Sequence, residues 1–136
     1  MARIVLTNAY VTVNSVDVSA FVASVTLNSS IDVVETTAFS TTAARTRIGG
    51  LADNSISLEF HQDYATSSIE ATIYPLLGTT TTVVVKPNGS TTSSTNPSYT
   101  ATVLVAEWTP LNGAVGELAS ASVTWPVSGA ITKATA

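Results

Sequence analysis

Short stretches in which apolar and polar residues alternate recur along most of the chain. Residues 10–13 and 16–19 alternate on either side of Asn14 and Ser15, a two-residue turn sequence that predicts a β-hairpin. Residues 3–6 have the composition of the start of an earlier strand. At residues 23–27, alanine, valine and leucine alternate with polar residues, which predicts one inward and one solvent-facing side. Two short strand-like runs are expected over residues 31–37.

The pattern is most regular in the middle and at the end of the chain. Over residues 55–61, Ile56, Leu58 and Phe60 alternate with polar side chains, as in a half-buried strand. Further strands are predicted at residues 80–87, where three consecutive valines suggest burial on both faces, and at 101–105 and 119–127. Pro126 belongs at an edge or at a strand end. These patterns predict a mainly β fold.

One short helix is expected between the strands. Ser67 and Glu70 have the spacing of a capping box, and four apolar residues follow at helical spacing, at positions 69, 73, 76 and 77. Pro75 predicts that regular helix ends near Tyr74, and Gly78 is a plausible left-handed stop. The apolar stripe predicts a helix that covers part of a sheet.

Residues 38–52 show neither the alternation of a strand nor the spacing of an amphipathic helix. They contain two of the five basic residues, Arg45 and Arg47. Long segments without secondary structure are uncommon in compact domains, and those that occur are usually functional or disordered. We therefore interpret residues 38–52 as a long loop that is either functional or disordered. Residues 88–98 and 109–116 are rich in turn-forming residues and predict two further connections.

Composition supports a strand-rich domain with few charges. The 136 residues include 23 threonines and 17 serines, and charged residues make up only 10% of the chain. The formal net charge of −4 argues against a protein that grips the phosphate backbone of a nucleic acid. Cysteine is absent, which excludes disulfides, thiolate zinc sites and iron–sulfur clusters. We expect neither a signal peptide nor a membrane span, because no apolar run is long enough.

The sequence contains one candidate pair for catalysis or metal binding. Glu59 and His61 are two residues apart on the polar side of a predicted strand, so they share a face. One histidine without cysteine needs two or more further carboxylates for a zinc site, and no such cluster is apparent nearby. The glycines at 49–50 lack the lysine of a phosphate-binding loop, and residues 53–54 are typical of a turn. We therefore predict no enzyme activity, no cofactor and no metal.

The basic and aromatic residues have more ordinary interpretations. Arg45 and Arg47 are expected to pair with acidic groups of the same fold or of a neighbouring subunit, with phosphate contact as the alternative. Trp108 and Trp125 are predicted near the ends of adjacent strands, where packing in the core or at an interface is the expected role and ligand stacking the alternative.

Five segments carry a resemblance that extends over nearly the whole chain: DVSAFV (17–22), VETTAF (34–39), RIGGL (47–51), SISLEF (55–60) and WPVSGAIT (125–132). Together with the order of the predicted elements, they resemble the major tail tube proteins of long-tailed bacteriophages and the related tube proteins of contractile injection systems. The resemblance implies a single domain over residues 1–136 with two packed antiparallel sheets, arranged like a sandwich or barrel. It also implies one short flanking helix and a long inter-ring loop.

The tail tube family implies self-assembly into stacked, hexameric rings around a lumen through which genomic DNA passes without specific binding. The loop would then make the ring-to-ring contact through Thr41, Thr42, Arg45, Thr46, Arg47, Ile48, Gly49 and Gly50. A negative charge on each subunit suits such a conduit, because an acidic wall repels phosphate. The implied partners are copies of the chain and the tape measure, terminator and tail tip proteins. The implied location is the virion tail, after synthesis in the host cytoplasm and without membrane contact.

Three other structural roles are open at this point. A capsid decoration or cement protein is also small, rich in β-structure and free of cysteine. A tail terminator or completion protein resembles the tube subunit but forms a single capping ring. An extracellular adhesive sandwich is the third, although no secretion signal supports it.

Overall fold

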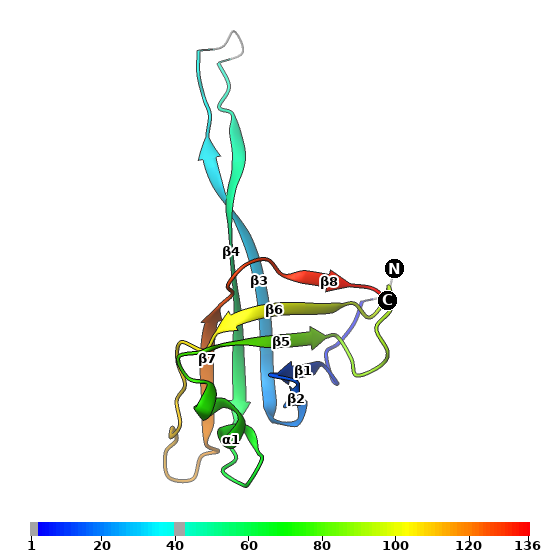
Figure 1. Ribbon diagram of the computed structural model, residues 1–136, viewed down its shortest axis with the longest axis vertical. Coiled ribbons are helices and arrows are strands. Elements are labelled where there is room, and N and C mark those ends of the chain that lie inside the picture. Colours follow the sequence, from blue (N-terminus) through cyan, green and yellow to red (C-terminus); the bar gives the residue numbers. More distant parts are fainter. Residues whose placement is uncertain (1–2, 40–42) are drawn as a thin grey trace.

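The computed structural model describes residues 3–39 and 43–136, and over these residues the chain is mainly β (Figure 1). Eight strands and one short α-helix follow one another in this described part, together with two single 3-10 turns at Ser19–Phe21 and Tyr74–Leu76. The elements are β1 (Tyr10–Val13), β2 (Val16–Asp17), β3 (Val22–Glu35), β4 (Arg47–His61), α1 (Ile69–Ile73), β5 (Thr80–Lys86), β6 (Ser98–Leu104), β7 (Ser120–Pro126) and β8 (Thr132–Ala134).

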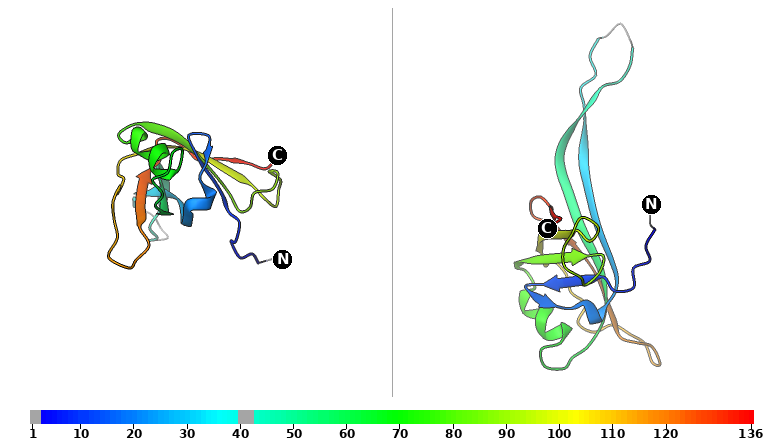
Figure 2. Two further views of the ribbon diagram at one scale, coloured as in Figure 1. Left: turned by 90° about the horizontal axis from the view of Figure 1, so that it is seen from below. Right: turned by 90° about the vertical axis from the view of Figure 1, so that its right-hand side faces the viewer.

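The strands form two antiparallel sheets, which confirms the predicted fold class. The larger sheet has the order β2-β1-β5-β6-β8, and the smaller has the order β3-β4-β7. In Figure 1 the strands of the two sheets run across one another, and Figure 2 shows the sheets as two layers. The chain passes between the layers just after β7, where the amide of Ser128 donates to the carbonyl of Thr102 at 2.7 Å.

The core lies between the sheets and follows the alternation in the sequence. In the body, every second residue of β7 and of the inner part of β4, from Ile56 to Phe60, points inward from the smaller sheet, and valines of β1, β5 and β6 meet them from the larger sheet. The central side chain is Phe60, with ring centroids of Trp108 and Trp125 at 5.7 and 6.4 Å. The expected packing role of both tryptophans is confirmed, but β6 and β7 belong to different sheets rather than lying next to each other.

The predicted N-terminal hairpin is present, and the strand predicted before it is not. Asn14 and Ser15 have φ values of 52° and 65°, the left-handed pair that suits the twist of a two-residue hairpin turn. Residues 3–6 lie outside any strand, and their apolar side chains are exposed. A segment with the composition of a strand forms one only where a partner strand is available. Within the described residues, residues 3–6 have no partner along their length.

The helix lies where the apolar stripe predicts it, but the prediction of a capping box between Ser67 and Glu70 is wrong. Ser67 has a φ of 63°, so Ser68 is the residue before the first helical turn, and its hydroxyl donates to Asp63 at 3.0 Å. Glu70 turns away from the cap and accepts a 2.7 Å hydrogen bond from the indole of Trp108. Regular helix ends at Ile73, before Pro75, as expected. Gly78 is left-handed with a φ of 85°, also as expected.

Two further strand predictions need adjustment. Alternation in β5 is stricter than the three valines suggested, because Val83 and Val85 are buried while Val84 is only half-buried. In β3, Ala23 is exposed because a register shift at this end of the strand inserts it as an extra residue. No helix in the described part of the chain is long and apolar enough to cross a membrane.

Candidate assembly surfaces

The feature that dominates the shape of the molecule is a long two-stranded arm. β3 and β4 leave the body together and continue well beyond the other strands (Figure 1). Their pairing runs from Val22 with Phe60 in the body to Glu35 with Arg47 far out on the arm. We call residues 30–53 the arm, of which the structure describes all except 40–42.

The arm corrects the prediction of a long irregular loop over residues 38–52. Residues 47–52 belong to β4, residues 31–35 belong to the same continuous strand as the body of β3, and residues 53–54 lie within β4 instead of forming a turn. The alternation is lost because β4 has one extra residue opposite Asp32, a β-bulge that shifts which side chains share a face. Two glycines at the bulge remove the remaining side-chain signal.

Both glycines are needed for close approach of the two strands. A Cβ on Gly50 would lie 2.9 Å from a methyl carbon of Val34 and 3.3 Å from the carbonyl oxygen of Asp32. A Cβ on Gly49 would lie 3.2 Å from a methyl carbon of Ile31. The glycines therefore allow the strands of the arm to stay paired across the bulge.

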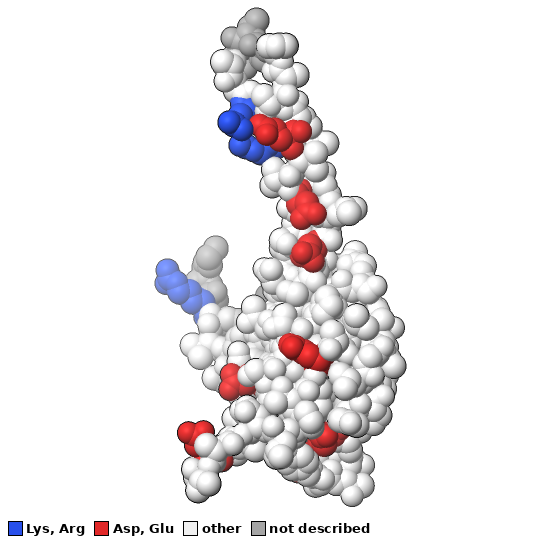
Figure 3. Space-filling view, turned by 90° about the vertical axis from the view of Figure 1, so that its left-hand side faces the viewer, with Lys and Arg blue, Asp and Glu red and all other residues white. Residues whose placement is uncertain are grey.

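Beyond the strand ends, threonine side chains continue the pairing of the two chains. The amide of Thr36 donates to the carbonyl of Thr46 at 2.9 Å, and their hydroxyls are also 2.9 Å apart. The amide of Thr46 donates in turn to the hydroxyl of Thr37 at 3.0 Å. Arg45 forms an exposed ion pair with Glu35 at 3.0 Å, the one ion pair among the described residues. Acidic and basic side chains gather on the arm in Figure 3.

The predicted contact residues divide between strand and connection. Thr41 and Thr42 lie outside the described residues. Arg45 and Thr46 lie in the connection, and residues 47–50 lie in β4. All six described residues of the prediction are therefore on the arm, and all are exposed.

Among the apolar side chains of the arm, sequence reasoning named only Ile48 as a contact and missed the others. Those exposed to solvent are Ile31, Val33, Val34, Phe39, Ile48 and Leu51, with exposed fractions from 45% to 110%. A lone two-stranded ribbon has no layer behind it, so neither face is buried by the subunit itself. The available signal was the apolar content of residues 31–37, where two short strands are predicted, and of Phe39 in the predicted loop.

A buried asparagine holds the base of the arm. Asn54 is 3% exposed, and its side chain accepts from the hydroxyl of Ser29 at 2.8 Å and donates to the carbonyl of Gly129 at 3.3 Å. The backbone carbonyl of Asn54 accepts a hydrogen bond from the backbone amide of Val127 at 2.9 Å. These bonds tie the two strands of the arm to the chain that follows β7.

The candidate pair Glu59 and His61 lies on the outer, polar face of the smaller sheet. Both side chains are exposed. Across residues 3–39 and 43–136, no group of three or more histidine, cysteine, aspartate or glutamate residues is placed to hold a metal ion.

Comparison with known proteins identifies similar folds only. No protein-family model matches the chain, and no curated protein matches it. One similar solved structure is a chain from the virion of a native gene transfer agent particle, with a TM-score of 0.68 and 16% identity over 85% of this chain and 86% of that one. Another is a chain of the anti-feeding prophage baseplate, 6-fold symmetrised, with a TM-score of 0.61 and 10% identity over 99% of this chain and 98% of that one. At these identities the likeness is one of fold.

Proposed function

We propose that this chain is a structural virion protein that assembles into stacked, hexameric rings, and that these rings form the tube of a phage tail. The arm points along the tube axis and contacts the next ring. The tube conducts DNA without binding it specifically. The partners at its ends are other tail proteins.

The observation that carries the proposal is the exposed apolar surface of the arm. Six large apolar side chains are exposed to solvent on the arm, a two-stranded ribbon that no other described strand pairs with. Val34 and Ile48 are cross-strand neighbours on the arm, and exposed apolar surface gathered in this way marks a protein interaction site. Each such side chain gains about 1.5–3 kcal/mol when it is fully removed from water, so a partner that covers the arm is strongly favoured.

The similar folds and the charge support this assignment. The two similar chains come from a virion and from a 6-fold symmetrised baseplate. A net charge of −4 on each subunit accumulates around a ring. Phosphate is then repelled over roughly the 8–10 Å that salt leaves unscreened. A tube that conducts DNA needs this repulsion, because a basic wall would hold the DNA back.

The proposal is tested by negative-stain electron microscopy of the purified protein over a range of concentrations. Hollow rings and tubes are expected. A trimmed variant replaces residues 32–51 with Asn-Gly, which joins the paired residues Ile31 and Ala52 by a two-residue turn. This variant should remain folded by circular dichroism and form rings that do not stack.

A matched pair of double variants avoids any change of chain length. Ile48→Ser with Leu51→Ser makes the arm more polar, and Tyr74→Ser with Leu77→Ser does the same beside the helix, which the proposal places on the outer flank. Only the double variant on the arm, Ile48→Ser with Leu51→Ser, should fail to form tubes. Tubes that persist after trimming contradict the role of the arm. Single caps favour a tail terminator, and solid trimers or monomers favour a decoration protein.

A further inference from the structure

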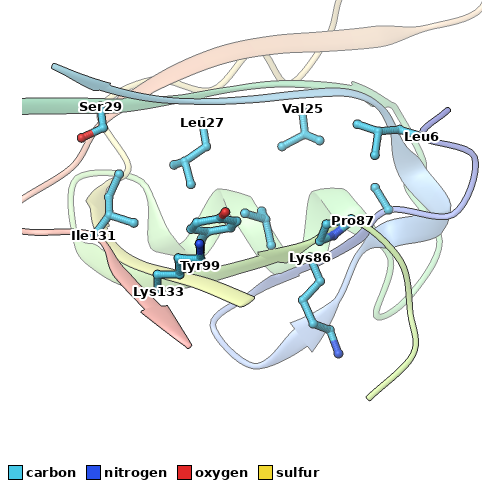
Figure 4. A pocket seen from close by; sticks show the side chains of 11 residues that line it. Leu6, Val25, Leu27, Ser29, Lys86, Pro87, Tyr99, Ile131 and Lys133 are labelled. Atoms are coloured by element: carbon cyan, nitrogen blue, oxygen red, sulfur yellow. The ribbon is translucent and has the colours of Figure 1, made fainter. Parts of the chain in front are cut away.

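An apolar groove opens between the two sheets on the side where both ends of the chain lie. Val25 and Leu27 of β3 line one wall, and Tyr99 of β6 with Ile131 lines the other (Figure 4). The groove has a volume of about 530 Å³, and all four of these side chains are half-buried. They extend the core outward to a place where the described residues of the subunit provide no covering layer.

A second unpartnered apolar surface lies on the loop of residues 105–119, which joins β6 to β7. Beyond its buried start, the loop exposes Leu111, Val115 and Leu118, with exposed fractions of 81%, 105% and 66%. These three side chains contribute nothing to the core of their own subunit. Their chemistry matches that of the groove.

The loop is held in shape although its tip is exposed. The carbonyl of Pro110 accepts hydrogen bonds from Gln62, at 3.0 Å, and from the hydroxyl of Tyr64. The amide of Glu117 donates to the carbonyl of Ala114 at 3.0 Å, closing a turn with left-handed Gly116. An ordered loop loses little conformational entropy when it binds, which favours a docking role.

The charges of the two surfaces are complementary. The groove is lined by both lysines of the chain, Lys86 and Lys133, and by no carboxylate. Lys86 already contacts the ring of Tyr10 and a carbonyl, so Lys133 is the lysine available to a partner. Glu117 is the one charged residue between positions 109 and 118, and it is exposed.

The positions of the two surfaces suit a head-to-tail contact. The groove is lined by residues near both chain ends, from Leu6 to Lys133. In Figures 1 and 2 the chain ends lie on one side of the body, and the 105–119 loop lies at the opposite end. The line from the chain ends to the 105–119 loop runs across the long axis of the arm, not along it. Two different patches at opposite ends of a subunit generate a ring when the rotation between neighbours closes.

We infer that the 105–119 loop of one subunit docks into the groove of a second copy of this chain. Val115 and its apolar neighbours enter the groove, and Glu117 pairs with Lys133. This contact rests on the proposed function, for which it supplies the lateral interface within a ring. The arm remains free for the contact between rings.

The edge strand β7 is poorly suited to backbone pairing with a neighbouring subunit, which favours a contact made by side chains. β7 is an edge strand, yet the amide of Thr124 donates to the Glu107 carboxylate at 2.7 Å and that of Ser120 to the Asn112 carbonyl at 3.2 Å. Pro126 has no amide hydrogen to offer. The loop and Pro126 therefore hinder the addition of a neighbouring strand at this edge.

Disulfide trapping tests the contact directly, because the chain has no cysteine of its own. Glu117→Cys and Lys133→Cys change two exposed positions, so both variants should fold. Mixing the two single variants under mild oxidation should give a mixed dimer. The double variant should give a ladder of species that ends at the number of subunits in the ring. Glu59→Cys replaces Glu117→Cys as the matched control and should give no ladder.

Charge reversal provides a second, independent readout. Glu117→Lys and Lys133→Glu should each raise the concentration needed for ring formation by about tenfold or more, because like charges then face each other. The double reversal should restore assembly to near the level of the unmodified protein. A double reversal that assembles no better than either single variant overturns the pairing.

The outcomes separate this contact from the proposed function. Rings or tubes of the unmodified protein without the expected disulfide overturn the docking and leave the proposed function standing. A disulfide ladder without stacked tubes supports the docking and overturns the tube. A disulfide from Lys133→Cys to Leu51→Cys on the arm, in place of Glu117→Cys, also overturns the docking. Absence of both rings and disulfide overturns both proposals.

Discussion

The side chain of Asn54 should contribute measurably to stability although it belongs to a polar residue. Asn54→Ala removes one hydrogen bond from the Ser29 hydroxyl and one to the Gly129 carbonyl. Each such bond has a net value of about 0.5–1.5 kcal/mol, and a buried group that loses its partner adds to the loss. We therefore expect the free energy of unfolding to fall by about 2 kcal/mol. For a domain of this size, that lowers the midpoint of thermal unfolding by roughly 8 °C.

Thermal unfolding followed by circular dichroism measures this change, and the neighbouring strand offers a matched control. Asn28 is an exposed asparagine on β3, and Asn28→Ala should change the free energy of unfolding by less than about 0.5 kcal/mol. Ser29→Ala removes only one of the two bonds and should fall between the two variants. Equal midpoints for Asn54→Ala and Asn28→Ala would refute the reasoning. Tube formation by Asn54→Ala should also decline below its unfolding temperature, because the base of the arm is no longer held.

Three further variants test the core, the arm and its ion pair. Phe60→Ala should lower the free energy of unfolding by about 3–5 kcal/mol, because a fully buried ring between two tryptophans is lost; a urea titration that shows less than about 2 kcal/mol contradicts this. Gly50→Ala should leave the thermal midpoint of the subunit nearly unchanged but reduce tube formation, because the new methyl group meets Val34 on the arm; normal tubes by electron microscopy would contradict it. Glu35→Gln breaks the exposed pair with Arg45 and should change the free energy of unfolding by less than about 1 kcal/mol, so a larger change in the urea midpoint would show a stronger pair than exposure allows.

Local patterns in the sequence determined most of the secondary structure. Alternation at positions 56, 58 and 60 predicts which side chains of β4 are buried, because successive residues of a strand face opposite sides whatever the strand pairs with. The hairpin turn at Asn14 and the helix end before Pro75 follow from backbone preferences of single residues. Composition also predicted a mainly β chain, since threonine and valine are β-branched residues that are enriched in strands.

Tertiary structure alone decided which strands pair, and with that the candidate interfaces. The bulge and the glycine pair hid the outer part of β4, since alternation is lost when one strand gains a residue that its partner lacks. The same limit applies to Asn54, which reads as a turn residue until the chain after β7 closes over it. The match between the 105–119 loop and the groove depends on two sheets and two subunits. Such contacts join residues far apart in the chain, and a pattern of neighbouring residues carries no information about them.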